Sequence, residues 1–305
     1  MLIDFRDSDF RPQFAGHETF PLRLLWLKKA YDAVAKGMAS RRTFQEQDAI
    51  ARFGVGKNMA ISMRHWVLAT GMVEDCEDGL RPSSLGFAIL DDETGFDPFL
   101  EKPATLWLVH FALAGSPETT TSFFYCFNVM NQAIFDRESI AAGLMDLAKS
   151  MNARVTAETI KRDVEVLIRS YVSKADGAED AVEPLLNELS LIREQRLANQ
   201  FEFVRGPKTS LPDGIFALAV RTFWKRWHPN APTLSAELLT YGTGSPGRVF
   251  KMDEESVLNR LARIGDITEG SIIWTDTAGL RQVSFVREIR EDSLLRASYT
   301  KENRS

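Results

Sequence analysis

The sequence predicts a mainly α-helical protein with three segments: a winged-helix-like domain over 1–90, a helical domain over 91–205 and a second winged-helix-like domain over 206–305. Three observations lead to this class. Apolar residues recur at helical spacing through most of the chain. A short helix, a glycine turn, a longer helix and a hairpin signal follow one another before residue 90, and a similar order of elements returns after residue 206. A chain of 305 residues has room for two or three domains.

The N-terminal segment contains three predicted helices and one hairpin. The first helix begins at Thr19, a good N-cap that Pro21 follows in the first turn. An amphipathic helix over 46–53, a glycine turn and a helix over 57–70 then have the spacing of a helix–turn–helix. The Asp-Gly pair within 73–82 predicts a hairpin, which would complete a winged helix.

Caps and apolar periodicity predict the remaining elements. In the middle segment, we expect one helix to start at Asp97–Pro98 and others to cover 121–142, 140–151, 156–171 and 181–197, with Thr156 as a cap. In the last segment, we expect helices over 215–227, 234–239 and 253–264, the last capped by Asp253, and a hairpin with strands at 272–274 and 282–286. Residues 290–305 are polar, and we expect them to be frayed.

The charge is unevenly distributed along the chain. The formal net charge of −5 divides into +1 over 1–90, −8 over 91–205 and +2 over 206–305. An acidic total argues against nucleic acid as a ligand, but basic residues gather in the two segments where winged helices are predicted. The distribution is therefore compatible with DNA binding by the ends and with protein partners for the acidic middle.

Cysteine content and hydropathy indicate the compartment and exclude several sites. Two distant cysteines, Cys76 and Cys126, form neither a disulfide framework nor a zinc motif. The chain shows no signal peptide and no apolar run that could span a bilayer, so we expect a cytoplasmic protein without a membrane partner. The Gly-Val-Gly-Lys sequence lacks the Walker spacing, because Asn58 follows Lys57, and we expect no organic cofactor.

The cluster around His17 is the first candidate site. His17, Glu18 and Arg23 lie at a predicted helix start, where free N–H groups favour anions. They could form a catalytic or phosphate-contacting corner. Alternatively, His17 and Glu18 cap the helix and attach it to the core.

Two carboxylates form the second candidate site. Asp97 and Glu101 are four residues apart and would share one helix face. Such a pair can hold Mg²⁺ or Mn²⁺, which a nuclease needs to activate water at a phosphodiester. The alternative is an ordinary helix cap on a solvated face.

The third candidate site is a nucleic-acid surface. Lys57, Asn58, Ser62 and Arg64 would face outward from the second helix of the helix–turn–helix, where side chains reach bases or phosphates. Arg81 in the hairpin and Arg23 near the first helix could contact the backbone of the nucleic acid. A solvated basic surface is the alternative interpretation.

Three long blocks of sequence carry a family resemblance: Phe14–Val34, Gly54–Val73 and Asp97–Leu113. They resemble a bacterial family of unknown function represented by the SspB component of DNA phosphorothioation systems. The resemblance implies a part in an anti-phage machine that replaces a non-bridging phosphate oxygen with sulfur. It also implies partners of three kinds: an ATPase, an adenylating enzyme and a cysteine desulfurase. The family's SspB is described as a DNA-nicking protein.

Three hypotheses remain open at this point. The chain is a DNA-binding and DNA-nicking subunit, in which Glu18, Asp97 or Glu101 holds a divalent cation. Alternatively, it is a non-catalytic scaffold whose acidic middle recruits the ATPase and sulfur-transfer partners to DNA. The third hypothesis is a winged-helix transcriptional regulator.

Overall fold

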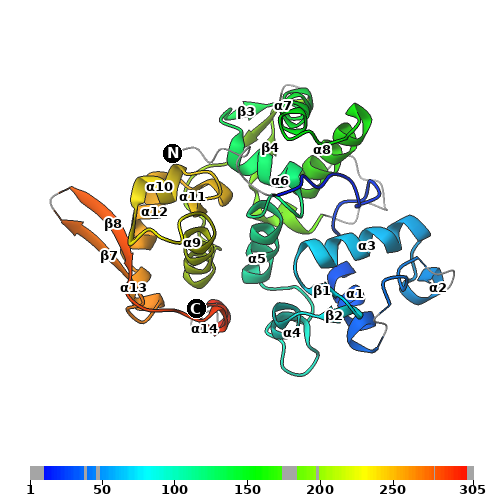
Figure 1. Ribbon diagram of the computed structural model, residues 1–305, viewed down its shortest axis with the longest axis horizontal. Coiled ribbons are helices and arrows are strands. Elements are labelled where there is room, and N and C mark those ends of the chain that lie inside the picture. The colour runs from blue at the N-terminus through cyan, green and yellow to red at the C-terminus, as the bar shows by residue number, and fades with distance from the viewer. Residues whose placement is uncertain are drawn as a thin grey trace. The chain divides into compact units, whose positions relative to one another are not determined.

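The computed structural model describes residues 10–37, 40–45, 49–173, 184–196, 199–277 and 279–300. Its described residues form two compact units. The N-terminal unit comprises 10–123 and 132–203, and the C-terminal unit comprises 124–131 and 204–300. Figure 1 labels the elements of both units. The predicted division into three segments stays a prediction.

The predicted mainly α class is wrong. The chain is about 50 % helical with 12 % strand, in three small sheets among the described residues, and is therefore a mixed α/β protein. The winged-helix assignments are not confirmed. Several strands are only two or three residues long, and some of them pair with segments that are distant in sequence. Such strands are too short to show the alternating pattern by which a strand is recognised in sequence.

The first part of the N-terminal unit follows the predicted order of elements. It contains α1 (Trp26–Ala35), α2 (Ala49–Phe53), α3 (Lys57–Ala69), β1 (Val73–Cys76), β2 (Gly79–Pro82) and α4 (Ser84–Leu90). β1 and β2 pair as the predicted antiparallel hairpin, with Val73 opposite Pro82. The start of the helix predicted over 46–53 lies outside the described residues. α3 packs on α1 and buries Met63, Trp66 and Val67.

The second part of this unit combines helices with a three-stranded sheet. It contains α5 (Pro103–Ala114), α6 (Thr121–Phe124), β3 (Ile134–Phe135), α7 (Arg137–Ser150), α8 (Ala157–Tyr171), η3 (Leu185–Leu189), β4 (Ile192–Glu194) and β5 (Phe201–Phe203). The sheet has the order β3-β5-β4 and is antiparallel. α7 and α8 pack against each other, and the N-cap predicted at Thr156 is confirmed by its bond from the Thr159 amide.

Left-handed backbone and capping account for three of the departures from the predicted helices. The first helix begins at Trp26, because Thr19 has φ of +67° and cannot adopt the extended N-cap conformation. The helix predicted over 121–142 is divided, and Asp136 begins α7 through a capping box. Near 181–197, Ser190 has φ of +49° and separates η3 from β4.

The C-terminal unit surrounds α9 with short helices and a hairpin. It contains η2 (Tyr125–Val129), α9 (Asp213–Trp227), β6 (Thr233–Ser235), α10 (Ala236–Tyr241), α11 (Pro246–Val249), α12 (Glu254–Leu261), α13 (Ile264–Ile267), β7 (Ile272–Thr277), β8 (Leu280–Phe285) and α14 (Glu291–Thr300). The predicted hairpin is present, and β6 adds to it in the order β6-β8-β7. The expected fraying is wrong for Glu291–Thr300, because α14 packs along α9, with Ser298 close to Gly214. Residues 301–305 lie outside the described residues. No helix within the described ranges combines the length and apolarity needed to cross a bilayer.

Candidate functional site

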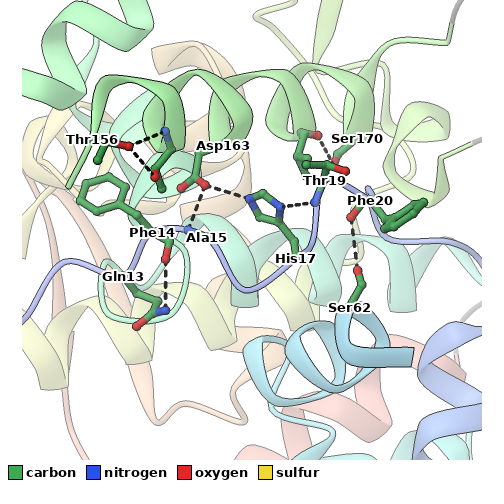
Figure 2. A network of polar contacts seen from close by, with 12 residues as sticks. Gln13, Phe14, Ala15, His17, Thr19, Phe20, Ser62, Thr156, Asp163 and Ser170 are labelled. Carbon is green, nitrogen blue, oxygen red and sulfur yellow. Dashed lines mark hydrogen bonds and ion pairs between the residues drawn. The ribbon is translucent and has the colours of Figure 1, made fainter. Parts of the chain in front are cut away.

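The segment before α1 is held in a corner formed by α3, α6 and α8. Gln13 exchanges two bonds with Thr121 of α6: its N–H donates to the hydroxyl at 2.8 Å, and its carbonyl accepts the Thr121 amide at 3.4 Å. At the other end, the Phe20 carbonyl accepts the indole N–H of Trp66 at 3.0 Å and the hydroxyl of Ser62 at 3.5 Å. Figure 2 shows how this segment follows α8. We call residues 13–20 the corner segment.

His17 is the buried centre of the corner segment. Its Nε2 lies 2.9 Å from Oδ1 of Asp163 in α8, and its Nδ1 accepts the Thr19 amide at 3.3 Å. Because Nδ1 accepts, the proton of the neutral ring is on Nε2 and is donated to Asp163. The same carboxylate oxygen accepts the Ala15 amide at 2.9 Å. Both ring nitrogens are therefore occupied within the protein, and His17 fixes the segment to α8.

The backbone of the corner segment is left-handed at four positions. Ala15, Gly16, Glu18 and Thr19 have φ of +65°, +94°, +47° and +67°. Each non-glycine residue in this region costs about 1–3 kcal/mol and persists only where its surroundings impose the conformation. Here the Asp163 and Trp66 contacts impose it. The result is a strained loop that buries His17 and exposes Ala15, Glu18 and Thr19.

His65 of α3 completes the corner. Its ring meets His17 edge-on at a centroid distance of 5.8 Å, and its Nε2 is buried without a hydrogen-bond partner in the described part of the chain. Burial, followed by the electrostatic effects of His17 and Arg64, lowers the pKa of His65 to about 3. Because its pKa is so low, His65 is neutral at physiological pH. Gly16 packs closely against this ring, so that an added Cβ would be 2.6 Å from His65 Nδ1.

Sequence reasoning missed Asp163, although a signal was available. Asp163 occupies the buried face of α8 with Ile160, Val164 and Leu167, which recur at helical spacing. A carboxylate on an apolar helix face needs a buried partner. That partner, His17, is 146 residues away, so local patterns could not identify it.

The predicted carboxylate pair has a different geometry from that expected. The helix begins at Pro103, so Asp97 and Glu101 precede α5 and do not share a helix face. Asp97 is buried; its Oδ1 accepts the Glu101 amide, and its Oδ2 accepts the Lys102 amide and the Thr105 hydroxyl. The Glu101 side chain is exposed. These bonds explain why 97–102 forms a turn before the helix.

The described residues offer few ligands for a magnesium ion. Within the described residues, no three His, Cys, Asp or Glu side chains come together to hold a metal ion. The carboxylate of Asp97 is already occupied by donors of its own chain. The residues that the structure describes therefore do not form a protein cage for Mg²⁺ or Mn²⁺.

The predicted nucleic-acid residues divide into paired and unpaired side chains. Arg64 and Arg81 reach neighbouring carboxylates of β1, because Arg64 binds Asp75 at 3.0 Å and Arg81 binds Glu74 at 3.0 Å. The guanidinium of Arg23 lies 5.3 Å from the ring centroid of Trp26, which is within cation–π distance. These contacts neutralise or occupy the three predicted arginines. The outward orientation predicted for Ser62 is wrong, because Ser62 is buried and its hydroxyl donates to the Phe20 carbonyl.

Lys57 and Asn58 are the unpaired members of that set. Both are exposed at the first two positions of α3, and neither has a hydrogen bond or ion pair among the described residues. The N-cap is Gly56, which provides no side-chain bond to the free amides of the helix. A helix N-terminus with unused N–H groups and a lysine favours an anion such as phosphate.

Comparisons with known proteins identify relatives of the whole chain. No curated protein matches it. Two solved structures match with a TM-score of 0.84 over 97 % of this chain and 90 % of the other: a magnesium ion-bound SspB crystal structure at 27 % identity and an SspB crystal structure at 26 %. The predicted resemblance to SspB is thereby confirmed. The model of the family described as "Protein of unknown function (DUF4007)" matches residues 14–299, and the chain belongs to this family.

Proposed function

We propose that this protein is a cytoplasmic, DNA-binding component of a phosphorothioation-type defence system. Its likeness to SspB over 97 % of the chain supports the assignment to the system. The free N-terminal end of α3 supports contact with DNA. The partners of the proposed system are an ATPase, an adenylating enzyme and a cysteine desulfurase.

The proposal of DNA binding depends on one observation, the difference between Lys57 and the other basic residues that were predicted to contact DNA. Arg64 and Arg81 form ion pairs with β1, whereas Lys57 is exposed and unpaired in the described structure. Beside it, Asn58 and the unused amides of α3 offer further donors. Together they can bind one or two backbone phosphates, which position a protein on a duplex without reading its sequence.

Duplex affinity tests this contact directly. Fluorescence anisotropy with a labelled 20-base-pair duplex should show Lys57→Gln binding about tenfold more weakly than the unmodified chain, since a charge-assisted bond is lost. Lys161→Gln is the matched control, because Lys161 is an exposed, unpaired lysine on α8 in the described structure. Equal affinity of Lys57→Gln and the unmodified protein would refute contact by α3.

DNA nicking is the second candidate function, favoured by the magnesium ion in one related SspB structure. Glu18 and Glu101 are exposed carboxylates that DNA could approach, but the described residues form no metal cage. Relaxation of supercoiled plasmid by the unmodified chain, abolished by EDTA and reduced in Glu18→Gln or Glu101→Gln, would support nicking. Without relaxation, retention of the ATPase in a pull-down would instead support the scaffold hypothesis.

A further inference from the structure

A groove next to the corner segment is unused by the function proposed above. It has a volume of about 500 Å³, within the range of roughly 300–1,000 Å³ typical of small-ligand sites. One wall is the extended segment 10–14, and the other is the turn between α7 and α8, residues 151–156. The groove lies entirely within the N-terminal unit.

Two arginines provide the charge of the groove. Arg11 lines one wall and Arg154 the other. Both are exposed, and neither has a hydrogen bond or ion pair within the described ranges. Glu158, a nearby carboxylate on α8, is paired with Arg162 at 3.2 Å. Each wall of the groove therefore contributes one arginine without an ion pair in the described structure, and a guanidinium group can bind an anionic group such as phosphate bidentately.

The remaining lining suits a flat aromatic ligand with polar edges. Phe10 and Phe14 are half-buried on the same wall as Arg11. Asn152 and Thr156 add an amide and a hydroxyl from the opposite turn, and Figure 2 shows Phe14 and Thr156 on the same side of α8. Rings that accept stacking beside cationic groups are the combination that single-stranded nucleic acids require.

We propose that this groove binds one or two nucleotides of single-stranded DNA, with Arg11 and Arg154 on the phosphate and Phe14 stacked on a base. Duplex DNA is excluded as the ligand of this groove, because its bases are not available for stacking on a side chain. The proposal is independent of the contact between α3 and duplex DNA. The two sites can therefore be tested and can fail separately.

The test compares pentathymidylate with an abasic five-unit strand, both labelled and measured by anisotropy on the full chain. We expect the abasic strand to bind about tenfold more weakly, because it has no base to stack on Phe14. Arg11→Gln and Arg154→Gln should each weaken pentathymidylate binding about tenfold, and Phe14→Leu should remove the preference for bases. Lys161→Gln is the control for loss of one positive charge.

The outcomes separate this site from that on α3. We expect Arg154→Gln to lose single-strand affinity and to keep duplex affinity, and Lys57→Gln to show the reverse. Equal binding of the abasic strand would overturn base stacking in the groove. Unchanged affinity of Arg11→Gln and Arg154→Gln, or an equal loss in Lys161→Gln, would overturn the site itself. Circular dichroism melting confirms that each variant is folded.

Discussion

The corner segment and the N-terminal end of α3 belong to the same unit but use their polar groups differently. In the corner, both nitrogens of His17 are bonded within the chain. The Asp163 carboxylate accepts the N–H of the His17 ring and the amide N–H of Ala15. At the end of α3, Lys57 and Asn58 have no partner among the described residues. A side chain whose bonds are internal determines the shape of the protein, whereas one with free donors is available to a ligand.

Substitution of Asp163 in the corner should have the largest effect, which is a loss of stability. Asp163→Ala leaves His17 and the Ala15 amide without their acceptor in a buried position, and we expect a loss of about 3 kcal/mol in the free energy of unfolding. Urea denaturation measures it. Asp163→Asn keeps one acceptor oxygen and should lose less. A loss under about 0.5 kcal/mol for Asp163→Ala would contradict the structural role of the corner.

A smaller loss is expected at Gly16. Gly16→Ala adds a Cβ 2.6 Å from His65 Nδ1 at a position with φ of +94°. We expect the variant to lose about 2 kcal/mol in unfolding free energy, since both the contact and the backbone conformation oppose a side chain. Gly37→Ala is the matched control, because Gly37 has a similar φ of +96° but no atom would lie within 4 Å of an added Cβ. Equal losses would show that only backbone strain matters.

The corner should also make stability depend on pH through His65. Its pKa is about 3 in the folded protein and near 6.5 when unfolded. Because the unfolded imidazole binds a proton that the folded one does not, stability from this group is lost as the pH falls from 6.5 towards 3. Urea unfolding at pH 7 and 4.5 should therefore differ less in His65→Gln than in the unmodified chain. The same difference in both would show that other groups cause it.

The end of α3 should show the smallest effect on stability. We expect Lys57→Gln and Asn58→Ala each to change the unfolding free energy by less than about 0.5 kcal/mol, because both side chains are exposed and make no contacts in the described structure. Urea denaturation of the two variants gives this number. A loss comparable to that of Gly16→Ala would mean that the end of α3 is structural too.

Elements with local signals could be predicted from the sequence. The Asp-Gly pair places β1 and β2 correctly, and Thr156 and Asp253 cap α8 and α12 as expected. Strand β3 could not be found, because it is two residues long and pairs Ile134 with Glu202, which is distant in sequence. Strands β4 and β5 pair with each other locally but are only three residues long. Long-range pairing leaves no local pattern in segments so short.

The candidate site could be predicted only in part, for the same reason. The unusual residues around His17 and the exposed end of α3 are visible in sequence, but the partners that distinguish their roles are not. Asp163 and Asp75 decide that His17 and Arg64 are internally bonded, and both contacts depend on the folded chain. Sequence identifies residue types that could bind DNA, whereas the fold determines which of them remain free.

The salt dependence of duplex binding is the strictest test of DNA contact through α3, because each bound phosphate releases counterions from DNA. Such contact predicts that the logarithm of the association constant falls linearly with the logarithm of salt concentration. It also predicts that Lys57→Gln reduces this slope by about 0.9, the value for one phosphate contact, while Asp163→Asn leaves the slope unchanged. Binding that is insensitive to salt, or an equal slope for Lys57→Gln and the unmodified protein, would contradict DNA contact through α3.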